Sequence, residues 1–155
     1  MRVAGLISLT AILLACQLGC SESVKVDDDA AKQEIQATLE AYLPLLGEAY
    51  ATGNVEPLRD WAAEKEMARI YKIVTELAAQ GRILVPTFHQ LTIEELNVWN
   101  YSNAYVTTLE VWDLETYASG TDQVLAQESE QPNRVKYQLK RDEDHWRVLF
   151  RTIQE

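Results

Sequence analysis

The sequence is poor in the residues from which metal and redox sites are built. It has two cysteines and two histidines in 155 residues, and Cys16 and Cys20 lie far along the chain from His89 and His145. A structural zinc site needs about four such ligands, so the composition argues against one. The sequence also offers no Ser-His-Asp set and no glycine-rich phosphate loop. We therefore expect no cofactor, no bound metal and no catalytic residue.

Basic residues are scarce as well. The chain has 14 lysines and arginines against 24 acidic residues, which gives a formal charge of −10. Nucleic-acid binding depends on clustered cations that neutralise phosphates, and docking on anionic lipid depends on similar clusters. The charge therefore argues against nucleic acid as a partner and against electrostatic attachment to a membrane surface.

The sequence has no apolar run long enough to span a bilayer. The longest stretch extends from Val3 to Leu14, with Gly5, Ser8 and Thr10 inside it, whereas a spanning helix needs about 20 apolar residues. Arg2 precedes this stretch and polar, acidic residues follow it. A cation followed by a short apolar run is typical of an export signal.

The signal ends at the two cysteines. The letters LLAC place Leu13 at −3 and Ala15 at −1 of Cys16, which resembles the lipobox of bacterial lipoproteins. The resemblance implies that the thiol of Cys16 receives a diacylglycerol and that Cys16 becomes the mature N-terminus. Cys20 is the alternative site, although it has Gln17 at −3 where the family usually has an aliphatic residue, so we favour Cys16.

This interpretation divides the chain and predicts its location. Residues 1–15 form the signal peptide, residues 16–29 form the lipidated cysteine and a polar tether, and residues 30–155 form one folded domain. The protein is then held at the cell envelope by its lipid. Neither cysteine is followed by aspartate, which in a Gram-negative source implies the periplasmic face of the outer membrane.

The first half of the domain has helical periodicity. A long helix begins near residue 30, with Asp27 to Asp29 at its start, and ends at Gly53; we expect Pro44 to kink it or split it. Asn54 caps a short second helix, and a third helix ends at Gly81. The predicted buried stripes are Ile35, Leu39, Tyr42, Leu43, Leu46, Ala49 and Tyr50 in the first helix and Met67, Ile70, Tyr71, Val74, Leu77 and Ala78 in the third.

The second half alternates with period two, which is typical of strands. We predict strands over 82–100, 103–117, 134–142 and 145–154, with a polar loop over 118–133. A change of phase near Glu94 and Glu95 predicts a bulge, which would bend the first strand. Helices that precede an antiparallel meander indicate an α+β fold, with the N-terminal helices packed on a curved four-stranded antiparallel sheet.

Two segments carry a resemblance to a known superfamily. AYATGNVEPLRDW (49–61) and VKYQLKRDEDHWRVLFRTI (135–153) resemble the nuclear transport factor 2-like (cystatin-like) cone domains, and the layout is similar to the IMS-type domain of plastid-division and cyanobacterial proteins. The resemblance implies a bent sheet wrapped around a long helix. Some members, such as ketosteroid isomerase, scytalone dehydratase and polyketide cyclases, are enzymes with a base in the mouth of the cone.

We name candidate pocket residues on the predicted strands. Glu110 and Asp113 lie in opposite phases of the predicted second strand, and each phase holds apolar residues, so one of the two carboxylates would follow an apolar row. The phase of Glu110 contains Val106, Trp112 and Leu114, and that of Asp113 contains Tyr105, Leu109 and Val111. Cross-strand pairs with six hairpin cations (Arg134, Lys136, Lys140, Arg141, Arg147 and Arg151) are the structural explanation for these carboxylates and for Glu115. The full candidate set is His89, Tyr105, Glu110, Trp112, Asp113 and Tyr137, with Asp60 as a further carboxylate.

Three hypotheses for function follow. The first is a non-catalytic, membrane-anchored lipoprotein whose domain binds a partner protein or a small molecule. The second is a small enzyme of the isomerase or dehydratase type, which requires a buried carboxylate or histidine within hydrogen-bond reach of a tyrosine in an open apolar cavity. The third is a module that forms a homodimer through its sheet.

Overall fold

The computed structural model describes residues 25–26 and 29–154. The predictions for Cys16, Cys20, the signal peptide, Asp27 and Asp28 lie outside these residues. The helices are α1 (Asp29–Thr52), the short 3₁₀ helix η1 (Glu56–Leu58) and α2 (Glu64–Ala79). The strands are β1 (Lys25–Val26), β2 (Arg82–Trp99), β3 (Asn103–Ala118), β4 (Val124–Asp142) and β5 (His145–Gln154).

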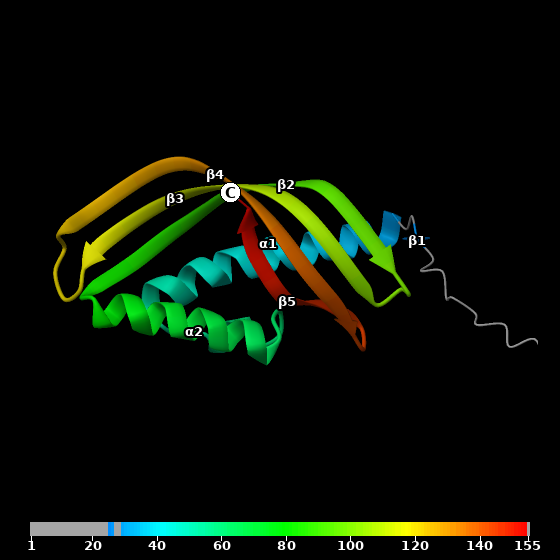
Figure 1. The fold of residues 1–155 in the computed structure, drawn as a ribbon, viewed down its shortest axis with the longest axis horizontal. Coiled ribbons are helices and arrows are strands. Elements are labelled where there is room, and N and C mark those ends of the chain that lie inside the picture. The colour runs from blue at the N-terminus through cyan, green and yellow to red at the C-terminus, as the bar shows by residue number, and fades with distance from the viewer. Residues whose placement is uncertain (1–24, 27–28, 155) are drawn as a thin grey trace, which may run out of the picture.

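The strands form one antiparallel sheet in the order β1-β2-β3-β4-β5. The sheet arches over α1, and α2 lies on the same side of it (Figure 1). This arrangement confirms the predicted α+β class with helices on a curved antiparallel sheet. The two-residue strand β1 falls inside the segment predicted as tether, and it pairs with Val98 and Trp99.

Helix α1 is the centre of the core. All seven residues of its predicted stripe are buried, as expected for a helix enclosed by a sheet. Of the two alternatives predicted at Pro44, a kink or two helical pieces, the second is wrong, because α1 continues through Pro44 as one helix. Pro44 itself is exposed, so its ring does not disturb the packing against the sheet.

Helix α2 is rotated relative to the predicted stripe. Met67 and Ile70 are buried as predicted, whereas Tyr71 is 56% exposed. The charged residue Glu66 takes a fully buried position instead. Glu66 can occupy this buried position because it accepts a hydrogen bond from Tyr42 of α1. A prediction based on apolar residues alone does not include such a polar contact.

The predicted polar loop over 118–133 was largely wrong. Strand β4 begins at Val124, and only residues 119–123 separate it from β3. Residues 124–130 are exposed on both faces of the sheet, so they lack the apolar alternation by which a strand is recognised. Pairing with the end of β3, from Leu114 to Tyr117, holds this segment in the sheet.

Bulges produce the curvature of the sheet. The predicted bulge near Glu94 and Glu95 is confirmed by a register shift between Ile93 and Glu95, and a second shift occurs between Phe88 and Gln90. Further shifts lie between Trp112 and Leu114 in β3 and at the pairing of Gln138 and Leu139 with β5. Each bulge bends its strand and increases its twist, which is how the long strands curve around α1.

Candidate functional site

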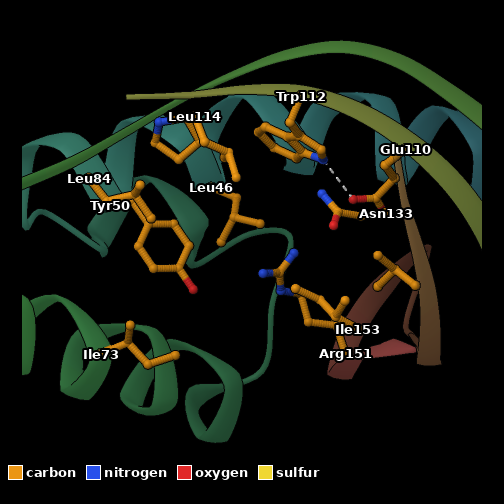
Figure 2. Close-up of a pocket in the computed structure, with 12 residues that line it drawn as sticks. Leu46, Tyr50, Ile73, Leu84, Glu110, Trp112, Leu114, Asn133, Arg151 and Ile153 are labelled. Carbon is orange, nitrogen blue, oxygen red and sulfur yellow. Dashed lines mark hydrogen bonds between the residues drawn. The ribbon is translucent and has the colours of Figure 1, made fainter. Parts of the chain in front are cut away.

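A cavity lies between α1, α2 and the concave face of the sheet (Figure 2). Its volume is about 210 Å³. Most of its wall is apolar, and polar groups enter from Glu110, Asn133, Arg151 and the hydroxyl of Tyr50. The lining residues are Leu46, Tyr50, Ile73, Leu84, Pro86, Glu110, Trp112, Leu114, Asn133, Val135, Arg151 and Ile153.

Glu110 is fully buried in the wall of this cavity. Strand alternation puts it on the inner face of β3 together with Thr108 and Trp112. Thr108 Oγ1 donates to Oε1 and Trp112 Nε1 donates to Oε2, each at 3.0 Å, and Tyr137 Oη donates a third bond to Oε1. These bonds explain how a carboxylate can follow an apolar row: its oxygens have protein donors in place of water.

Tyr137 is a donor in this network at neutral pH. Burial raises the pKa of its hydroxyl well above the ordinary value, and the nearby carboxylate of Glu110 raises it further. The phenol therefore keeps its proton and directs it to Glu110. Tyr137 bonds to the carboxylate of Glu110 and does not itself line the cavity.

A second buried carboxylate, Glu66, belongs to α2. Arg69 holds it with two hydrogen bonds, from Nε to Oε2 at 2.9 Å and from Nη2 to Oε1 at 2.6 Å. Tyr42 Oη donates to the same Oε1 at 3.3 Å. This carboxylate therefore has a paired cation and a third donor of its own.

Arg151 brings a cation into the cavity wall. Its side chain is 11% exposed, and the Nε atom is buried without a hydrogen-bond partner among the described residues. The ion pair found for it joins Nε to Glu66 Oε1 at 3.9 Å, beyond hydrogen-bond length. The guanidinium is charged, because arginine is not deprotonated in proteins.

A bulge directs Arg151 inward. Along β5, Trp146 and Val148 face the core, so simple alternation would put Phe150 inside and Arg151 outside. Val148 pairs with Leu139 and Phe150 pairs with Gln138, which leaves Leu149 as an extra residue. A slip of one residue exchanges the two faces of a strand, and Phe150 is accordingly exposed while Arg151 points into the cone.

The start of β5 is held by hydrogen bonds to a segment that precedes it in the sequence. The link between η1 and α2 bonds to Val148 through two backbone hydrogen bonds of 2.8 Å, one from Ala63 N to Val148 O and one from Val148 N to Trp61 O. These bonds hold the start of β5 against the segment that leads into α2.

The predicted site residues divide into two groups. Glu110 and Trp112 line the cavity and Tyr137 bonds to Glu110. His89, Tyr105 and Asp113 do not line it. Their neighbours Ala104, Trp112 and Leu114 face inward, so strand alternation turns Tyr105 and Asp113 to the outer face.

The outer-face residues have their own partners. His89 Nε2 and Asp113 Oδ2 are 2.8 Å apart, and Tyr105 stacks on Trp99 with ring centroids 4.7 Å apart. Asp60 is exposed, and its backbone oxygen lies 3.1 Å from Nε2 of His145. These contacts account for the positions of these residues without a ligand.

The predicted pairing of the hairpin cations was wrong in its partners. The arginines pair with acids other than Glu110, Asp113 and Glu115: Arg134 with Glu94 at 2.7 Å, Arg141 with Glu34 at 3.2 Å and Arg147 with Asp142 at 3.4 Å. Glu115 instead accepts a hydrogen bond from Tyr117. The register explains this, because Glu115 pairs with Gln127, far along β4 from the cations.

Two features are absent from the described residues: a cluster of metal ligands and a helix that could span a membrane. Over 25–26 and 29–154, no three His, Cys, Asp or Glu side chains are grouped closely enough to hold a metal ion. None of the helices in this part of the chain combines the length and the apolar character needed to cross a membrane.

Comparison with solved structures finds similar cones in other proteins. The intermembrane-space region of the chloroplast protein ARC6 is 13% identical, with a TM-score of 0.67 over 83% of this chain and 98% of that one. A protein from Catenulispora acidiphila in complex with S-DNPA is 15% identical, with a TM-score of 0.50 over 81% and 93% of the two chains. An NTF2-like protein with a cystatin-like fold from Novosphingobium aromaticivorans is 15% identical, with a TM-score of 0.45 over 83% and 90%.

One of these neighbours is an intermembrane-space region, and another is described as an NTF2-like protein with a cystatin-like fold. The likeness to the intermembrane-space region agrees with the architecture expected from the resemblance of the sequence. No family model matches the chain, and no curated protein matches its sequence. The likeness is therefore one of fold, and the chemistry of the site has to be argued from its own residues.

Proposed function

We propose that the protein is a lipid-anchored binding protein of the cell envelope, whose cone cavity holds a small, mostly apolar ligand. The observation that carries the proposal is the cavity itself, which is concave and apolar with a few polar groups directed into it. That combination is typical of small-molecule sites. At about 210 Å³ the cavity is smaller than most ligand pockets, so the ligand is small. The complex of the C. acidiphila cone with S-DNPA agrees with a ligand in a domain of this shape.

The hydrogen bonding of Glu110 favours binding over catalysis. A general base needs a free lone pair directed at the proton it removes. The carboxylate of Glu110 already accepts bonds from Thr108, Trp112 and Tyr137, which use three of its roughly four lone-pair positions, and the Tyr137 hydroxyl is directed at Glu110. Most of the hydrogen-bonding capacity of this pair is therefore used within the protein.

Ligand binding can be tested with a neutral probe. The Cys16→Ser, Cys20→Ser protein, which cannot be acylated at either site, would be titrated with 1-hexanol and followed by NMR. We expect saturable shifts at Leu46, Leu84 and Trp112. The variant Ile73→Trp, which enlarges a side chain of the cavity wall, should abolish them.

Leu77→Trp is the matched control, because Leu77 is one turn further along α2, is also half-buried, and lines a different hollow. This variant should keep the shifts. Shifts that fail to saturate in the unaltered cavity, or that survive Ile73→Trp, would contradict the proposal.

The anchor is the second part of the proposal. Lys25 lies nine positions after Cys16, and at about 3.3–3.6 Å per residue this length of chain spans at most roughly 30 Å. A lipid on Cys16 would thus keep the domain close to the bilayer. Metabolic labelling with a palmitate analogue should mark the natural chain and not Cys16→Ser; labelling lost only in Cys20→Ser would move the anchor to Cys20.

One observation favours the enzyme as a second candidate. A buried carboxylate, Glu110, lies within hydrogen-bond reach of Tyr137 at an apolar cavity, as the isomerase or dehydratase hypothesis requires. Such an enzyme would remove a proton next to a carbonyl group. Deuterium exchange from D₂O into cyclohexanone, faster than in buffer and lost in Glu110→Gln, would support this function; exchange at the buffer rate would count against it.

A further inference from the structure

The buried cation in the cavity has no acceptor of its own. The side chain of Arg151 is 11% exposed, its Nε has no hydrogen-bond partner in the described part of the chain, and its ion pair with Glu66 is 3.9 Å long. A buried donor without an acceptor costs about 1–3 kcal/mol and more when it is charged. A protein that keeps such a group loses stability unless something else supplies the acceptor.

The two nearby carboxylates do not supply it. Glu66 is held by the fork of Arg69 and by Tyr42. Glu110 accepts from Thr108, Trp112 and Tyr137. Each carboxylate therefore already has three donors, while the Nε of Arg151, part of a guanidinium with five N–H groups, has no acceptor among the described residues.

The direction of the side chain agrees with this count. Figure 2 shows the guanidinium of Arg151 extending away from Ile153 toward the middle of the lining residues, on the side of Leu46. The group thus borders the space that a ligand would occupy. The apolar part of the wall, with Leu84 and Leu114, lies along the rest of the cavity.

We propose that the ligand is a small amphipathic carboxylate, whose carboxylate group binds the guanidinium of Arg151 and whose apolar part packs on Leu46, Leu84 and Leu114. This inference rests on the proposed function and names its ligand class. A planar guanidinium matches a carboxylate with two parallel hydrogen bonds. Since water takes about 30 Å³, the cavity of about 210 Å³ has room for about seven such groups, which suits an acid of hexanoate size.

The experiment compares three ligands that differ only in the head group. The Cys16→Ser, Cys20→Ser protein is titrated at pH 7 with hexanoate, 1-hexanol and hexylamine, and the NMR shifts of the lining residues give each dissociation constant. We expect hexanoate to bind at least tenfold more tightly than 1-hexanol, and hexylamine to bind most weakly. This comparison needs no variant of the cavity.

The outcomes separate the two proposals. If 1-hexanol binds as tightly as hexanoate or more tightly, the carboxylate inference is wrong and the apolar binding site stands. If hexanoate, 1-hexanol and hexylamine all fail to bind, both proposals are wrong. If hexylamine binds best, the cavity prefers a cation and the role of Arg151 is overturned.

Variants then assign the preference to one side chain. Arg151→Met should remove the tenfold preference for hexanoate and keep the affinity for 1-hexanol, and Arg151→Lys, which keeps the charge without the fork, should retain part of it. The matched control is Arg147→Met, since Arg147 lies on the same strand and pairs with Asp142 outside the cavity. A preference that survives in Arg151→Met would overturn the proposal; one that is equally lost in Arg147→Met would do the same.

Discussion

At the scale of single residues, two buried charged side chains line the cavity, and they differ in how well their hydrogen bonds are satisfied. Glu110 receives three hydrogen bonds from side chains on its own sheet. The Nε–H of Arg151 has no hydrogen-bond acceptor among the described residues. A group that lowers stability and borders a cavity is better explained by binding than by folding.

The first prediction concerns the cost of Arg151. Replacing a buried, poorly paired ion with an apolar residue of similar length is often neutral or stabilising by about 1–4 kcal/mol. We expect Arg151→Met to raise the free energy of unfolding in the absence of ligand, because Glu66 keeps Arg69 as its cation. Urea denaturation with constant m-value measures this, with Arg147→Met as the control. A large destabilisation would show that Arg151 supports the fold.

The second prediction separates the charge of Glu110 from its hydrogen bonds. In Glu110→Gln the amide oxygen can accept from the Trp112 N–H, which is only a donor, while the amide NH₂ can donate to the hydroxyls of Thr108 and Tyr137. We therefore expect Glu110→Gln to fold with a small loss of stability. Glu110→Leu leaves the Trp112 N–H without an acceptor and should cost about 1–3 kcal/mol more. Thermal unfolding of both variants tests this, and equal losses would contradict it.

At the scale of elements, the fold depends on how closely α1 approaches β2. A Cβ atom on Gly47 would lie 2.8 Å from the backbone oxygen of Pro86 and 3.7 Å from the ring of Trp112. A backbone oxygen cannot move aside as the end of a flexible side chain can. The absence of a side chain at Gly47 therefore sets the distance between the helix and the sheet on one wall of the cavity.

The third prediction follows from that distance. Gly47→Ala adds a methyl group to a packed contact, which typically costs about 1–3 kcal/mol, and here the cost exceeds the gain in helix propensity of about 1 kcal/mol. We expect a lower midpoint of urea unfolding. The control is Glu48→Ala, which changes an exposed position next to it on the helix. An unchanged or raised midpoint for Gly47→Ala would contradict the close contact.

The fourth prediction concerns the join between β3 and the bulged part of β4. The carboxylate of Asp113 accepts the backbone N–H of Glu130 at 2.7 Å and faces His89, and these contacts lower the pKa of Asp113. Because the folded pKa is lowered, their stabilising effect is complete above the ordinary pKa of about 3.9 and is lost as the pH falls through the folded pKa.

A carboxyl NMR titration should therefore show Asp113 with a pKa below that ordinary value. In Asp113→Asn, stability should depend less steeply on pH over the acid range, because this group no longer binds a proton on unfolding. An ordinary pKa for Asp113, or an unchanged acid dependence in the variant, would show that the contact with Glu130 is not maintained in solution.

At the scale of the whole molecule, the helices and the sheet meet around the cavity. Residues from α1, α2 and strands β2 to β5 all line it. A ligand held there contacts every layer of the domain, and it binds the folded state only, because the cavity exists only when the layers are assembled.

The fifth prediction is this linkage. A ligand present at about 100 times its dissociation constant raises the free energy of unfolding by about 2.7 kcal/mol. Hexanoate should stabilise the protein in this way and should fail to do so in Ile73→Trp, while Leu77→Trp responds normally. Thermal unfolding at rising hexanoate concentration measures the effect. A midpoint that rises equally in Ile73→Trp would indicate binding elsewhere on the molecule.

Much of this architecture could be predicted from the sequence. The stripe of α1, the change from helical to strand period after Gly81 and the bulge near Glu94 follow from local patterns of apolar residues, which depend only on the geometry of a helix or strand. The same alternation predicted that either Glu110 or Asp113 would follow an apolar row, and the structure buries Glu110. The first half of β4 could not be predicted, because its residues are exposed on both faces and only their pairing with β3 makes them a strand.

The sequence by itself determined the class of the fold and the strand alternation that separates Glu110 from Asp113, and it predicts an export signal with a lipobox-like cysteine. Only the tertiary structure decided that Arg151 belongs to the cavity. Its phase on β5 depends on the extra residue Leu149, which exists as a bulge only through the register of β5 on β4. Register is a property of two paired strands and not of either alone, so the assembled sheet decides that this charge lies at the cavity.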